Sequence, residues 1–101
     1  MIGRFFTETT RLDAREAVLI VVDMQERIMP AMAGQKALID ACGLLIRGCR
    51  ILDLPVIFTQ QYTTGLGLTI PEIVAAATDD GASGFSFIEK TSFSVLGEPG
   101  F

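Results

Sequence analysis

The sequence contains no histidine, no tryptophan and no long apolar run. Without histidine it lacks the commonest general base and the commonest ligand of transition metals, so we expect no metal site and no cofactor. The longest apolar run, residues 17–22, is far short of the roughly 20 residues that span a bilayer. Basic residues are scattered and the net charge is −4, which argues against nucleic acid or a membrane surface as a partner. No stretch of signal-peptide length opens the chain, which predicts a cytoplasmic protein.

Cysteine is also scarce, with only Cys42 and Cys49 present. They lie seven residues apart in a segment of helical periodicity, so roughly 10 Å of helix axis separates them. A disulfide requires Cα atoms within about 7 Å, so the two should not pair with each other. Both fall among leucines on one apolar stripe, and we interpret them as small buried hydrophobic residues rather than nucleophiles. Unbridged cysteines are typical of a reducing compartment.

What is present is an alternation of strand-like and helix-like segments. The β-branched run over residues 18–22 is continuous, as in a strand of a parallel sheet that is buried on both faces. Residues 35–54 carry apolar side chains at spacings of three and four, which predicts a helix ending before a proline. Residues 55–59 predict a second strand, residues 69–78 a short helix, and residues 84–88 a third strand.

This order predicts an α/β protein whose parallel strands are joined by right-handed crossovers. Three strands are few for a finished doubly wound sheet. We therefore expect a Rossmann-like three-layer α/β/α fold, of which the chain holds only the first half. No repeat or low-complexity segment divides the sequence, so residues 1–101 are interpreted as a single incomplete domain.

Polar residues follow the predicted strands at Asp23, Gln60 and Lys90. Ligands of open α/β sheets bind at the carboxyl ends of the strands. If the strand order is third, second, first, the backbones of Asp23 and Lys90 are roughly 10 Å apart, which their side chains can bridge. Near a thiol, such a carboxylate can accept the proton while the ammonium favours the thiolate. The residues alone leave open that both are ordinary solvated charges.

Three blocks of the sequence resemble the isochorismatase-like hydrolases. VLIVVDMQERIMPAM, residues 18–32, resembles the strand and Asp-Met-Gln motif that open the family. LPVIFTQQYTTGLGLTIPEI, residues 54–73, is similar to its second strand and following loop. FIEKTSFSVL, residues 87–96, looks like the segment that carries the family lysine. The blocks follow one another in the order of the family.

The resemblance implies an Asp-Lys-Cys triad that hydrolyses a small amide or related carbonyl, or in some members cleaves a vinyl ether. Asp23 matches the family aspartate, the proposed base, and Lys90 matches its lysine. The family cysteine follows a fourth strand that these residues do not include, so we expect a truncated chain that is inactive alone. By position, Gln25, Gln60 and Tyr62 are candidate substrate-lining residues.

The resemblance leaves the wider role of the protein open. The metal-binding Asp/His cluster of the nicotinamidase members is not matched, which again predicts no metal. We expect the full-length protein to take a small-molecule substrate and to form a homo-oligomer, and the first strand to expose an edge that can pair with another chain. The alternative is a catalytically inactive α/β module kept for binding or oligomerisation.

Overall fold

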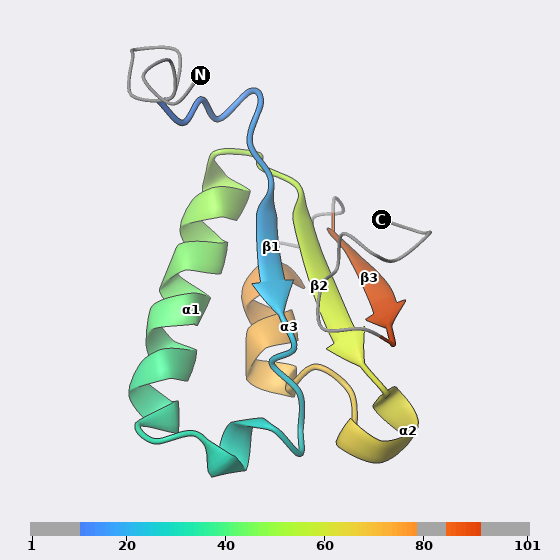
Figure 1. Cartoon of the computed structure of the whole chain (residues 1–101). Coiled ribbons are helices and arrows are strands. Elements are labelled where there is room, and N and C mark those ends of the chain that lie inside the picture. The colour runs from blue at the N-terminus through green and yellow to red at the C-terminus, as the bar shows by residue number, and fades with distance from the viewer. Residues whose placement is uncertain (1–10, 79–84, 92–101) are drawn as a thin grey trace, which may run out of the picture.

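The structure, a computed structural model, describes residues 11–78 and 85–91 as an α/β fold (Figure 1). Its elements in chain order are β1 (Leu19–Val22), the 3-10 turn η3 (Met29–Ala31), α1 (Gln35–Ile51), β2 (Val56–Gln61), α2 (Thr63–Leu66), α3 (Pro71–Thr78) and β3 (Phe85–Lys90). The alternation of strands and helices predicted from the sequence is therefore confirmed.

The strands form one parallel sheet in the order β1-β2-β3. Val21 of β1 lies opposite Phe58 of β2, and Phe58 lies opposite Phe87 of β3. Both α1 and α3 lie on one side of the sheet (Figure 1), because right-handed crossovers that advance in one direction place their helices on one face. The predicted α/β class is confirmed, and the strand order is the one assumed in estimating the separation of Asp23 and Lys90. Within residues 11–78 and 85–91, no helix forms the opposite layer of the expected three-layer arrangement.

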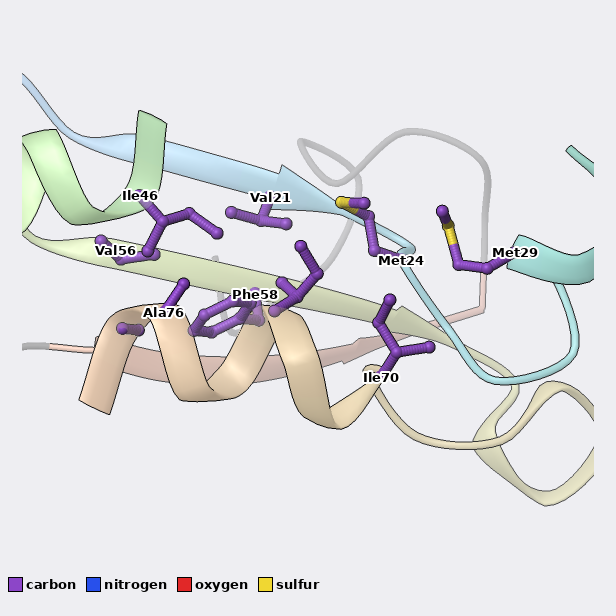
Figure 2. Packing of buried hydrophobic residues seen from close by; sticks show 10 residues of the cluster. Val21, Met24, Met29, Ile46, Val56, Phe58, Ile70 and Ala76 are labelled. Atoms are coloured by element: carbon purple, nitrogen blue, oxygen red, sulfur yellow. The ribbon is translucent and has the colours of Figure 1, made fainter. Parts of the chain in front are cut away.

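The hydrophobic core lies between this face of the sheet and the two helices (Figure 2). Val56 and Phe58 of β2 are completely buried, and Ile46 of α1 and Ala76 of α3 pack with them. Phe58 also stacks on Phe87, with ring centroids 5.0 Å apart. Burial of apolar surface is worth roughly 25 cal/mol per Å². This packing fixes the direction of β2 and therefore the positions of the strand ends.

Several boundaries differ from those expected, and β3 runs to Lys90 rather than ending at residue 88. β2 runs to Gln61 rather than ending at Thr59, because its ladder with β3 continues until Gln61 lies opposite Lys90. Pairing with a neighbouring strand thus overrides the polar local sequence. The helix predicted over residues 35–54 ends at Ile51. The short helix α2 lies between the segments predicted as the second strand and the second helix.

Helix α1 carries both cysteines, and both are free, as their spacing predicted. Cys42 packs against the core cluster. Each side chain is partly buried rather than exposed. In the part of the chain that the structure describes, neither this helix nor another is long and apolar enough to cross a membrane.

Candidate active site

Asp23 directly follows β1, and its backbone is left-handed, with φ 53°. This conformation is unfavourable for residues with a Cβ and is found preferentially at functional sites. Thr59 of β2 forms hydrogen bonds with both the backbone and the side chain of Asp23. The backbone N–H of Asp23 donates to the carbonyl oxygen of Thr59 at 3.1 Å and to its Oγ1 at 3.2 Å. The hydroxyl of Thr59 donates in turn to Asp23 Oδ1 at 2.8 Å, which fixes the orientation of the carboxylate.

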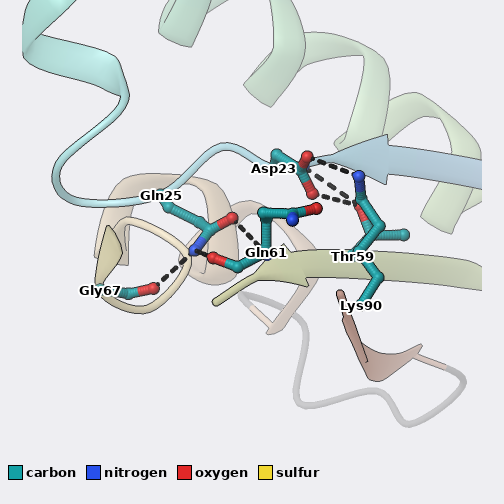
Figure 3. Close-up of polar contacts among 6 residues, drawn as sticks. All are labelled: Asp23, Gln25, Thr59, Gln61, Gly67 and Lys90. Atoms are coloured by element: carbon teal, nitrogen blue, oxygen red, sulfur yellow. Dashed lines mark hydrogen bonds and ion pairs between the residues drawn. The ribbon is translucent and has the colours of Figure 1, made fainter. Parts of the chain in front are cut away.

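Lys90, the last residue of β3, forms an ion pair with Asp23 across the end of β2 (Figure 3). Its Nζ lies 2.9 Å from Asp23 Oδ2. The Lys90 side chain is 1% exposed and that of Asp23 is 21% exposed. A buried ammonium requires a close counter-charge, because removing an isolated charge from water is very costly. The structure thus brings together the two residues expected to be catalytic, and their catalytic role stays a prediction.

Gln25 is completely buried and joins the end of β2 to the following loop. Its Nε2 donates to the carbonyl oxygens of Gln61 at 2.9 Å and of Gly67 at 2.7 Å. Its Oε1 accepts from the backbone N–H of Gln61 at 2.6 Å. This geometry gives Gln25 a positioning role, and its predicted contact with a substrate stays a prediction.

Gln60 is not brought to the ion pair, whereas the backbone N–H of Tyr62 donates to the carbonyl oxygen of Lys90 at 3.4 Å. Gln60 lies opposite Glu89, one residue out of phase with Lys90, so its side chain points to the helix-covered face of the sheet. There its Oε1 accepts hydrogen bonds from the N–H of Thr69 at 2.9 Å and from its hydroxyl at 3.0 Å. Tyr62 is 61% exposed. For both residues, substrate contact stays a prediction.

Gln61 lies on the sheet face that carries Lys90, and the sequence analysis missed it. The two residues are opposite each other in the β2–β3 register, and Figure 3 shows the Gln61 amide extending toward the ion pair. The signal that could have found it is strand alternation. A strand that continues past Thr59 returns to the same face two residues later, at Gln61.

A mainly apolar groove of about 480 Å³ opens beside Asp23, between β1 and α1. Its lining includes Val22, Met29 and Cys42, and Asp23 is its charged member. A hollow of this size is typical of sites for small molecules. Among the described residues, no group of three or more His, Cys, Asp or Glu side chains could hold a metal ion.

Replacing Gln25 with methionine should lower the free energy of unfolding by about 2 kcal/mol, because buried backbone groups of Gln61 and Gly67 lose their partners. Methionine keeps the length of the side chain without its amide. Urea denaturation followed by circular dichroism measures the change. Gln35→Met, at an exposed position, is the matched control and should cost less than about 0.5 kcal/mol. Equal urea midpoints for Gln25→Met and Gln35→Met would contradict the positioning role of Gln25.

Open parallel sheets bind their ligands at the carboxyl ends of the strands, and the buried ion pair lies there. The fold and this site together define an α/β domain with a polar site at the carboxyl ends of its parallel strands. The family model described as the isochorismatase domain matches residues 17–101. The chain therefore belongs to the isochorismatase domain family, which is of hydrolase type.

Relatives in animals are similar over most of the chain. Isochorismatase domain-containing protein 2 of Danio rerio is 39% identical over 88 residues, which are 87% of this chain and 41% of that protein. Isochorismatase domain-containing protein 2A of Mus musculus is 31% identical over 86 residues, which are 85% of this chain and 38% of that protein. The chain thus spans about two-fifths of the length of these relatives.

A solved structure, described as that of the MAR1 ribonuclease from Caenorhabditis elegans, has a similar fold, with a TM-score of 0.79 and 31% sequence identity. The match covers 89% of this chain and 44% of that one.

Proposed function

We propose that Asp23 and Lys90 are two members of a hydrolase site at which a cysteine thiolate attacks a small amide or related carbonyl. The observation that carries this proposal is the 2.9 Å ion pair between a strained aspartate and a buried lysine at the strand ends. Membership of a hydrolase-type family supports it. A fixed carboxylate supplies a proton acceptor, and a buried ammonium supplies a positive charge.

In the proposed reaction, Asp23 accepts the proton of the thiol, and the charge of Lys90 favours the resulting thiolate. The thiolate adds to the carbonyl carbon, and the amine leaves with a proton. Water then hydrolyses the acyl-enzyme. Thr59 acts as a positioning residue, because its bond to Asp23 Oδ1 leaves Oδ2 directed to Lys90. Cleavage of a vinyl ether at the same site, without a thiolate, is the other reaction that the resemblance implies.

The proposed nucleophile is neither Cys42 nor Cys49. Cys42 lines the groove beside Asp23, but its helix packs this side chain against the core. The relatives extend well beyond the matched segment. We propose that the nucleophilic cysteine belongs to a part of the whole protein outside these 101 residues, and that the 101-residue chain alone hydrolyses no amide.

The test is ammonia release by the whole protein from a panel of small primary amides. Asp23→Asn and Lys90→Met should each lower kcat by roughly a thousandfold or more, since each removes a group that acts in the transition state. The kcat values of Cys42→Ala and Cys49→Ala should stay within about twofold of that of the unsubstituted protein. Circular dichroism controls for folding. Turnover that survives Lys90→Met, or that is lost in Cys42→Ala, contradicts the proposal.

Two other functions are distinguished by the amide assay and by a second assay with RNA. Absence of turnover in a folded, oligomeric whole protein would favour a catalytically inactive binding or oligomerisation module. We favour an amide hydrolase over the ribonuclease activity named for the nematode protein, because acidic residues outnumber basic ones by 12 to 8 in this chain, whereas RNA phosphates attract Lys and Arg. Cleavage of a labelled RNA by the whole protein, lost in Asp23→Asn, would overturn that choice. The cytoplasmic location stays a prediction.

A further inference from the structure

The side-chain oxygen of Gln61, Oε1, is buried and accepts no hydrogen bond from the described residues. Nearly all buried polar atoms of folded proteins have a hydrogen-bond partner, so an acceptor of this kind requires an explanation. Its position at the site indicates what that partner is.

Gln61 lies beside both charges of the proposed site. It is the register partner of Lys90, and neighbouring strands are about 4.8 Å apart. Thr59, which holds the Asp23 carboxylate, precedes Gln61 by two positions on β2 and faces the same side of the sheet. Figure 3 shows the Gln61 amide extending from β2 toward the carboxylate and the ammonium.

The backbone of Gln61 is fixed by a clamp. The amide of Gln25 bonds both the carbonyl oxygen and the N–H of Gln61, at 2.9 and 2.6 Å. The clamp is rigid because Gln25 is completely buried. The clamp fixes the backbone from which the Gln61 side chain extends, so this segment loses little backbone freedom when a ligand binds.

The three groups together complement an amide. Lys90 is a donor, Gln61 Oε1 is a buried acceptor without a hydrogen-bond donor among the described residues, and Asp23 is the proposed base. We infer that Gln61 is a substrate-binding residue whose Oε1 accepts a hydrogen bond from the N–H of a small carboxamide. The inference rests on the proposed function for the location of the substrate. It adds Gln61 as a substrate-binding residue and a preference for amides over esters. An ester lacks this N–H and would leave Oε1 without a donor.

The experiment uses the whole protein with acetamide, isobutyramide and benzamide, each compared with its methyl ester. Gln61→Met keeps the side-chain length without the amide. It should lower kcat/KM for the amides by roughly tenfold to a hundredfold and change kcat/KM for the esters by less than about twofold. Gln35→Met, at an exposed position of α1, is the matched control and should change neither.

Equal losses on amides and esters would overturn the inference, because Gln61 would then support only the fold or contact the acyl oxygen through Nε2. Binding is measured in parallel by NMR, from the shift of the Gln61 side-chain amide during titration with benzamide or N,N-dimethylbenzamide. A preference for benzamide that Gln61→Met abolishes, without turnover, supports the inference and overturns the hydrolase proposal. Amide turnover that Gln61→Met leaves unchanged supports the hydrolase proposal and overturns the inference. A protein that neither binds nor hydrolyses these amides overturns both.

Discussion

Replacing Asp23 with alanine should lower the free energy of unfolding of the 101-residue chain by about 4 kcal/mol. The loss is large because the substitution leaves the Lys90 ammonium, 1% exposed, without its 2.9 Å counter-charge. Adding Lys90→Met to this variant removes the ammonium that has lost its Asp23 counter-charge, so the double variant should recover about 2 kcal/mol. Urea denaturation measures all three proteins. If Asp23→Ala is unfolded without urea, the double variant should still fold.

The matched control is the exposed ion pair of Lys36 and Asp40 on α1, whose charged atoms are 2.8 Å apart. The two side chains are 87% and 64% exposed, so Asp40→Ala should cost less than about 0.5 kcal/mol. Similar losses for Asp23→Ala and Asp40→Ala would show that burial contributes nothing to the Asp23–Lys90 pair. A double variant with a lower free energy of unfolding than Asp23→Ala would show that the aliphatic part of the Lys90 side chain stabilises the fold even without Asp23.

The second large effect concerns the oligomeric state. β1 lies at an edge of the described sheet. The N–H of Leu19 donates to the carbonyl of Pro55, just before β2, and that of Asp23 donates to Thr59 of β2, so the N–H groups of Ile20 and Val22 point away from β2. Val22 is also 57% exposed. An apolar strand edge is a template for pairing with another chain, and we expect the 101-residue chain to self-associate through β1 as its concentration rises.

Light scattering coupled to size-exclusion chromatography tests this expectation. Val22→Lys places a charge on the edge and should weaken association by roughly tenfold or more. Leu44→Lys is the control, because Leu44 is 74% exposed on α1 and lies away from the groove. A chain that stays monomeric at all concentrations, or two variants that dissociate equally, would contradict pairing through β1.

The fold was predictable because its elements are encoded locally. The continuous β-branched run of β1 and the three-and-four spacing of α1 depend only on near neighbours in the sequence. Once the strand order was assumed, geometry also placed Asp23 within reach of Lys90, and the ion pair is observed. The boundaries were less predictable. β2 extends to Gln61 because β3 pairs with it there, and no local pattern encodes that partner.

The polar arrangement around the ion pair was the least predictable part. A glutamine has the same local signature whether it is buried or exposed, so the sequence did not indicate that Gln25 would be 0% exposed and hold Gln61. Ending the strand at Thr59 also directed attention to Gln60. That residue faces the helices, whereas Gln61 faces Lys90. Because the predicted end of β2 came two residues too early, Gln60 was predicted as a site residue in place of Gln61.

The contacts of the site join segments that lie far apart in the chain. Thr59 follows Asp23 by 36 residues, and Gly67 follows Gln25 by 42. Lys90 comes later still. At a synthesis rate of roughly 5–20 residues per second, Asp23 leaves the ribosome several seconds before its lysine. During that interval the nascent chain can bury its helices and first strands, but it cannot complete the ion pair. Assembly of the site therefore has to follow the emergence of β3 from the ribosome.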